Sequence, residues 1–120
     1  MLNTVAWFEV GTDDPDGAQR FYGDLFGWTF ASDPKAPMDY RLITQGEGDR
    51  PSGGVYGSKG EFPNYAIFSV LVEDVEATCA KVESLGGKVV HKVISADDTS
   101  FAYLRDVGDN LFGVFTPPAG

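Results

Sequence analysis

The two halves of this chain contain the same helix-capping and helix-ending residues at a constant separation of 60 residues. In each half, an aspartate suited to capping a helix precedes a glycine suited to ending it, and a later glycine falls on the last predicted strand. The matched pairs are Val10 and Val70, Asp14 and Asp74, Gly27 and Gly87, and Gly53 and Gly113. Two copies are too few for a solenoid, so the repeat predicts two modules related by pseudo-twofold symmetry, whose sheets form a concave cleft.

The first half predicts a strand, a helix and three further strands. Residues 4–10 are rich in β-branched and aromatic types, which favour a strand. Asp14 and Pro15 favour a helix start, because aspartate is preferred at the cap and proline at the first helical position. Apolar residues at helical spacing predict one buried helix face, formed by Ala18, Phe21, Tyr22, Leu25 and Phe26. The three later strands are expected over residues 28–31, 40–44 and 53–56.

The second half repeats this order. We expect a strand over residues 64–72 and a helix capped by Asp74, ended by Gly86 and Gly87, and then three strands over residues 88–94, 100–105 and 111–115. The apolar positions of this helix are Val75, Cys79, Val82 and Leu85. The prediction is an α+β fold of two tandem βαβββ modules with a mixed sheet. Residues 1–120 form a single domain in this interpretation, with module 1 at 1–57, a linker at 58–63 and module 2 at 64–116.

Charge and cysteine content narrow the classes of function. The chain has 120 residues, with 18 acidic and nine basic side chains, giving a net charge of −9. This excess disfavours nucleic acids and anionic membranes as partners, and favours neutral or cationic ligands. Cys79 is the only cysteine, so no intrachain disulfide can form. No signal peptide pattern and no apolar run of the ~20 residues that span a bilayer is present, so we expect a cytoplasmic protein.

Four segments resemble a known superfamily. They read VAWFEVGTDDPDGAQRFYGDLFGW, PSGGVYG, PNYAIFSVLVEDVEATCAKVESLGGKVV and RDVGDNLFGVF, in that order along the chain. Their order resembles the glyoxalase, bleomycin-resistance and dioxygenase proteins, also called the vicinal oxygen chelate superfamily. In the last segment Val107 replaces a proline that is usual there, and Gly108 and Asp109 stand in reversed order. The resemblance implies a homodimer, which edge strands in need of cover also favour.

The resemblance further implies a divalent metal bound by residues of the first and last strand of each module. Those positions fall at Trp7 and Ile67, near Gly53 or Gly54, and at Gly113, and none of these side chains can bind a metal. The residues alone lead to the same expectation, because a catalytic zinc site needs about three histidine or carboxylate ligands. The only histidine is His91, and Glu9 is the only acidic residue in a strand predicted to line the cleft. We therefore expect no metal and no other cofactor.

The candidate ligand contacts are aromatic residues together with one carboxylate. Trp7 and Glu9 share a strand face because side chains alternate along a strand. The predicted ligand-binding residues are Trp7, Glu9, Tyr40, Tyr65, Phe101 and Tyr103. Glu9 is also the candidate catalytic base, unless it pairs with Arg41 or Arg105 or points into water. Core packing is the alternative role for each aromatic ring.

These residues favour a binding protein that uses no metal. Its expected ligand is a small, partly aromatic organic molecule, and a cationic ligand is one form of this hypothesis. Antibiotic sequestration, which needs affinity and no catalytic group, is one concrete form that the resemblance implies. One alternative is a metal-dependent lyase, isomerase or dioxygenase of the same superfamily, and another is a metal-free enzyme that uses Glu9 as base. Whether any reaction is catalysed stays open at this point.

Overall fold

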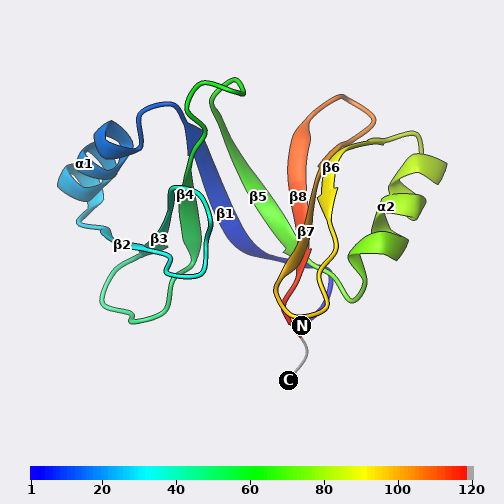
Figure 1. The fold of residues 1–120 in the computed structure, drawn as a ribbon, viewed down its shortest axis with the longest axis horizontal. Helices are drawn as coiled ribbons and strands as arrows, with labels where there is room; N and C mark the ends of the chain where they lie inside the picture. The colour runs from blue at the N-terminus through cyan, green and yellow to red at the C-terminus, as the bar shows by residue number, and fades with distance from the viewer. Residues whose placement is uncertain (119–120) are drawn as a thin grey trace. The chain divides into compact units, whose positions relative to one another are not determined.

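The computed structural model describes residues 1–118, which form two compact units. We call Trp7–Ala66 the first unit, and Met1–Ala6 together with the chain from Ile67 onward the second unit. Figure 1 shows that each half of the chain contributes a strand, a helix and three strands, in the predicted order. The α+β class and the two tandem βαβββ modules are therefore confirmed. No helix within residues 1–118 is both long and apolar enough to cross a membrane.

The first unit is built on β1 (Thr4–Thr12), α1 (Pro15–Phe26), β2 (Thr29–Ser32), β3 (Tyr40–Thr44) and β4 (Gly53–Gly57). Its strand order is β2-β3-β4-β1, with β1 parallel to β4 and the other pairs antiparallel. The register pairs Glu9 with Gly54 and Tyr40 with Tyr56. Because paired residues point to the same side of a sheet, this register fixes which side chains share the face of Glu9.

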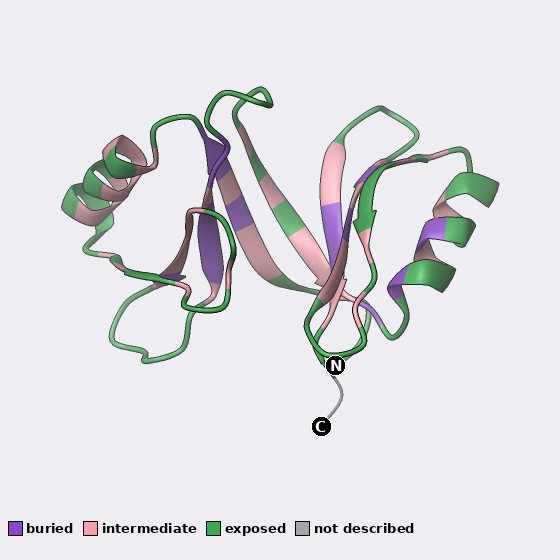
Figure 2. Cartoon of the chain, in the orientation of Figure 1, coloured by how far each residue is buried: buried purple, intermediate pink, exposed green. Residues whose placement is uncertain are grey.

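The second unit is built on β5 (Tyr65–Leu71), α2 (Val75–Ser84), β6 (Lys88–Val93), β7 (Ser100–Arg105) and β8 (Leu111–Thr116). Its strand order is β5-β8-β7-β6, and β5 is parallel to β8. Helix α2 packs on this sheet through the buried Val75 and Cys79, and Figure 2 shows buried positions along this helix. The buried cluster consists of Val72, Val75, Cys79, Ala102, Leu104 and Val114. Cys79 is thus a buried free thiol, and burial raises its pKa.

Both helices begin as the sequence predicts. The Asp14 side chain accepts a hydrogen bond from the Gly17 amide at 3.0 Å, and Asp74 accepts one from the Ala77 amide at 3.0 Å. These bonds satisfy amides that have no partner within the first helical turn. The caps thus keep their separation of 60 residues.

The glycine pairs of the repeat need a correction of one residue. Gly27 ends α1 at φ 74°, but the left-handed glycine after α2 is Gly86, at φ 95°, and not Gly87. Helix α2 has ten residues and α1 has twelve, so the separation shortens beyond the helices. The register confirms this, because Gly113 pairs with Ser69 as Gly54 pairs with Glu9. Gly113 therefore corresponds to Gly54 and not to Gly53.

The predicted buried face of α1 is only partly right, because Ala18 and Tyr22 are half-buried but Phe21, Leu25 and Phe26 are exposed. None of the residues of α1 is buried, and the exposed fractions of Phe21, Leu25 and Phe26 are 61%, 57% and 56% (Figure 2). The face toward the sheet includes Tyr22, which stacks on Trp28, and Gln19, which binds Arg41. Periodicity identified Tyr22 but not the polar contact of Gln19, so the face that meets the sheet lies to one side of the predicted one.

Candidate functional site

Strand β1 places Trp7 and Glu9 on one face of the first unit and Phe8 on the other. Phe8 lies against Trp28, with ring centroids 5.6 Å apart, so its face is the one that α1 covers. The opposite face carries Glu9, whose exposed fraction is only 7%. Glu9 therefore does not point into water, and a buried carboxylate needs hydrogen-bond partners to offset its lost hydration.

Two tyrosines supply these partners. The Tyr40 hydroxyl donates to Glu9 Oε1 at 2.7 Å, and the Tyr65 hydroxyl donates to Glu9 Oε2 at 2.5 Å. Trp7 Nε1 in turn donates to the Tyr40 hydroxyl at 2.9 Å. We call Trp7, Glu9, Tyr40 and Tyr65 the Glu9 network. The structure thus brings together four of the six predicted ligand-binding residues, and hydrogen bonds to an ionised acceptor are the stronger kind.

Two glycines that sequence reasoning did not assign to the site make room for this network. A Cβ atom at Gly54 would overlap the ring of Tyr40, and a Cβ atom at Gly11 would overlap the ring of Tyr65. Both tyrosine rings therefore lie directly against strand backbone. A glycine inside a strand often marks such a close approach, which was the available signal in the sequence.

Burial changes the acid–base chemistry of Tyr40. Loss of hydration is the first cause that raises its pKa far above the ordinary phenol value, and the nearby Glu9 carboxylate is the second. The hydrogen bond from Trp7 acts in the opposite direction and is outweighed. Tyr40 therefore stays protonated and remains a hydrogen-bond donor to Glu9 throughout the physiological pH range.

This raised pKa predicts a loss of stability at alkaline pH. The contribution is present in full below the unfolded phenol pKa of about 10, and above it the unfolded chain releases a proton that the folded chain keeps. Stability from Tyr40 should then fall by about 1.4 kcal/mol per pH unit. Urea unfolding of the wild type and of Tyr40→Phe at about pH 8 and about pH 11 measures this effect. The difference in free energy of unfolding between the two proteins should be smaller at the higher pH. A gap that stays constant would contradict the raised pKa.

The other two predicted contact residues lie on β7 in the second unit. The rings of Phe101 and Tyr103 meet edge to face with centroids 5.8 Å apart. The exposed His91 pairs in register with Tyr103, and its ring centroid is 6.4 Å from that of Phe101. This unit therefore carries its own aromatic surface, with an imidazole at its border.

The arginines have structural partners of their own. Arg41 binds Asp39 through two contacts of 3.1 Å, Asp16 at 2.8 Å and Gln19 at 3.0 Å. The bonds to Asp39 are the first cause that raises the pKa of Arg41. Arg105 donates to the Asp109 carbonyl at 3.0 Å. Neither arginine is thus the partner that the sequence left open for Glu9.

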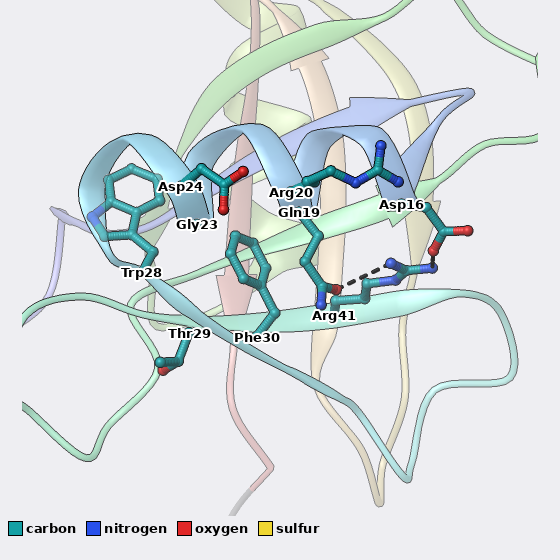
Figure 3. A pocket seen from close by; sticks show the side chains of 9 residues that line it. All are labelled: Asp16, Gln19, Arg20, Gly23, Asp24, Trp28, Thr29, Phe30 and Arg41. Atoms are coloured by element: carbon teal, nitrogen blue, oxygen red, sulfur yellow. Dashed lines mark hydrogen bonds and ion pairs between the residues drawn. The ribbon is translucent and has the colours of Figure 1, made fainter.

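Arg41 also lines a groove of about 690 Å³ between α1, β2 and β3. Figure 3 shows its guanidinium group turned toward Asp16 and Gln19 at one end, while Trp28 lies at the other. Its contacts with Asp16 and Gln19 join β3 to α1, whereas Asp39 lies just before β3 itself. Arg41 therefore connects α1 to the sheet, and its Nε, Nη1 and Nη2 atoms all have partners.

The residues at the family's metal positions do not fit a metal. Trp7, Gly54, Ile67 and Gly113 carry no ligand atom in their side chains. The ring of Tyr40 fills the space in front of Gly54, and the Ser69 hydroxyl would be 2.9 Å from a Cβ atom at Gly113. Within residues 1–118, no group of three or more His, Cys, Asp or Glu side chains is placed to hold a metal ion. No step that uses a metal can be derived from these residues.

Comparison with known proteins identifies the family. The chain is 31% identical over 116 residues to "Putative glyoxylase CFP32" of Mycobacterium tuberculosis, which covers 95% of this chain and 44% of that protein. It is 30% identical over 129 residues to the anthracycline biosynthesis protein DnrV of Streptomyces peucetius, covering 96% of this chain and 43% of DnrV. The chain thus spans less than half the length of both relatives.

The fold is also similar to that of known proteins of this kind. A methylmalonyl-CoA epimerase of Streptomyces coelicolor superposes with a TM-score of 0.67 at 13% identity, covering 99% of this chain and all of that one. Residues 4–114 match the family described as the Glyoxalase/Bleomycin resistance protein/Dioxygenase superfamily. The chain therefore belongs to the glyoxalase, bleomycin-resistance and dioxygenase superfamily.

Proposed function

We propose that this protein binds a small, partly aromatic organic molecule without a metal, and that the Glu9 network is its polar anchor. The observation that carries the proposal is the buried Glu9 carboxylate, held on both oxygens by phenols on an aromatic face. Small-molecule sites are mostly apolar and contain a few polar groups in fixed positions. The proposed contact residues of this anchor are Trp7, Glu9, Tyr40 and Tyr65, which all lie in the first unit, while Phe101 and Tyr103 are proposed separately as contact residues of the second unit.

The chemistry of this face favours a ligand with an aromatic part and a positive charge. A carboxylate attracts an ammonium group, and indole and phenol rings attract cations through their faces. The net charge of −9 acts in the same direction. The similarity to a relative named for anthracycline biosynthesis makes amino-sugar anthracyclines reasonable first probes. We also propose a cytoplasmic location, with which the free thiol of the single cysteine, Cys79, agrees.

The same network supports one enzymatic alternative, in which Glu9 removes a proton from the ligand. Geometry makes this the second choice. Each oxygen of Glu9 already accepts a hydrogen bond from a phenol, so a ligand proton has to reach the remaining lone pair of a carboxylate that is only 7% exposed. The fixed positions of these phenols suit binding without further rearrangement.

Calorimetric titration with an amino-sugar anthracycline and with its neutral aglycone tests the proposal. We expect the amine to bind more tightly than the aglycone. Glu9→Gln should weaken the binding of the amine by about tenfold and leave the binding of the aglycone unchanged. Tyr56→Phe is the matched control, since Tyr56 pairs with Tyr40 across the strands but lies outside the Glu9 network. Equal affinity of the wild type and Glu9→Gln for the amine would refute the anchor.

Metal analysis of the purified protein, before and after chelation, separates the proposal from the metal-dependent alternative. We expect substoichiometric metal and an affinity for the probe that chelation leaves unchanged. Near-stoichiometric nickel, zinc, iron or manganese, with binding lost on chelation, would refute the metal-free part of the proposal.

A further inference from the structure

Helix α1 leaves an apolar stripe exposed on the side away from its sheet. Gly17, Arg20, Phe21, Asp24 and Leu25 line a groove of about 500 Å³, and we call these five residues the α1 stripe. Their spacing puts them on one helix face, and Arg20 and Asp24 at the border of this face also line the groove between α1, β2 and β3. Phe21 and Leu25 remain more than half exposed there. Adjoining exposed apolar side chains of this size commonly mark a contact surface.

We propose that the α1 stripe is an interface on which a second copy of this chain packs, with the two α1 helices antiparallel about a twofold axis near Phe21. In a twofold contact, positions at equal distances before and after the axis oppose each other. Gly17 and Leu25 lie four residues before and after Phe21, so each Leu25 meets the notch at the partner's Gly17. The two Phe21 rings then meet at the axis.

The notch at Gly17 is enforced by the local structure. A Cβ atom there would overlap the Asp14 carboxylate that caps the helix, so the position cannot carry a larger side chain without losing the cap. The stripe therefore offers both a protruding leucine and a recess, in positions that the twofold axis brings together. This self-complementary shape singles out a second copy as the occupant.

Charge supports the same partner. Arg20 precedes the axis and Asp24 follows it, so in the antiparallel pair each Arg20 lies within one helical turn of the partner's Asp24. Arg41, Lys92 and Arg105 each form ion pairs inside the chain, whereas Arg20 forms none among residues 1–118. A pair of chains that each carry a net charge of −9 repel each other, and two Arg20–Asp24 contacts offset part of that repulsion.

The size of the stripe predicts a weak dimer. A stable interface buries about 800 Å² per partner, and one helix of twelve residues offers less than that. We therefore expect a dissociation constant of about micromolar order, with monomers dominating in dilute solution. Sedimentation velocity on the full chain over a wide concentration range measures the equilibrium.

Charge exchange is the decisive test. Arg20→Glu and Asp24→Arg should each weaken dimerisation by about tenfold or more, because each sets like charges opposite one another twice. The double variant with both changes restores the opposite-charge pairs and should return to within about threefold of the wild type. Leu25→Glu should abolish the dimer, and Leu85→Glu, at an exposed position directly after α2, should leave it unchanged.

Circular dichroism confirms that each variant is folded, which is expected because the altered side chains are exposed. A chain that stays monomeric at every concentration would refute the proposal. A dimer whose dissociation constant is unchanged by Leu25→Glu and by both charge reversals would refute it too, since its interface would then lie elsewhere. Ligand affinity of the Glu9 network is not affected by either result, so the two proposals are tested separately.

Discussion

Replacing Glu9 by alanine should lower the free energy of unfolding by about 3 kcal/mol. The hydroxyls of Tyr40 and Tyr65 lose the acceptor that they now meet at 2.7 and 2.5 Å, at a position from which water is nearly excluded. Removing one partner of a buried hydrogen bond costs more than the bond itself contributes, because the remaining donor stays desolvated. The missing side chain also leaves a void against the aromatic rings. Urea unfolding at neutral pH measures the loss.

Two comparison variants separate the network from a general effect of losing a carboxylate. Glu73→Ala removes an exposed glutamate just before α2 and should change stability by less than about 0.5 kcal/mol. Glu9→Gln keeps the shape and one acceptor oxygen, so its loss should fall between those of the two alanine variants. Wild-type stability in Glu9→Ala would show that the carboxylate contributes nothing to the fold, and that the buried network has been misjudged.

The secondary structure could be predicted because its signals are local. Asp14, Pro15 and Gly27 set the bounds of α1 within one short segment, and the structure gives those bounds unchanged. The strands over residues 40–44 and 100–105 are also found as predicted. Capping and turn chemistry depend on neighbours a few residues away, which a single sequence displays in full.

The packing face of α1 and the one-residue shift of the repeat could not be predicted in this way. The face of α1 that meets the sheet includes Gln19, which binds Arg41 across 22 positions of the chain, and neither polar residue carries a periodic signal. The shift of one residue arises because α2 ends two residues sooner relative to its cap than α1 does, while one residue, Leu85, separates its end from the left-handed Gly86. Either Gly86 or Gly87 satisfies the sequence pattern, and only the backbone conformation decides between them.

The sequence predicted which residues belong to the candidate site, but not which of them form hydrogen bonds with each other. Alternation along β1 placed Trp7 and Glu9 together, and this follows from strand geometry alone. The hydroxyls that bind Glu9 come from residues 31 and 56 positions away, and arginine seemed an equally reasonable partner from the sequence. What selects tyrosine is the space that Gly54 and Gly11 leave open on the neighbouring backbone. Cross-strand register, which fixes that space, is a tertiary property.

The same space gives the second large effect, which we expect from Gly54→Ala. One added methyl group would overlap the ring of Tyr40, whose hydroxyl forms hydrogen bonds with both Trp7 and Glu9. A free side chain would swing aside at little cost, but here the ring must give up two buried hydrogen bonds or β3 must move away from β4. Either response should cost about 3 kcal/mol. Gly48→Ala is the control, because a methyl group there meets only ordinary contacts, and it should stay within about 0.5 kcal/mol.

A double-mutant cycle with Tyr40→Ala shows whether the ring is the cause. Once the ring is gone, the methyl group at position 54 has room, so Gly54→Ala should cost less than about 1 kcal/mol in that background. The coupling between the two sites would then be about 2 kcal/mol, which is large for single side chains. Additive losses would mean that position 54 requires glycine for its backbone and not for the tyrosine.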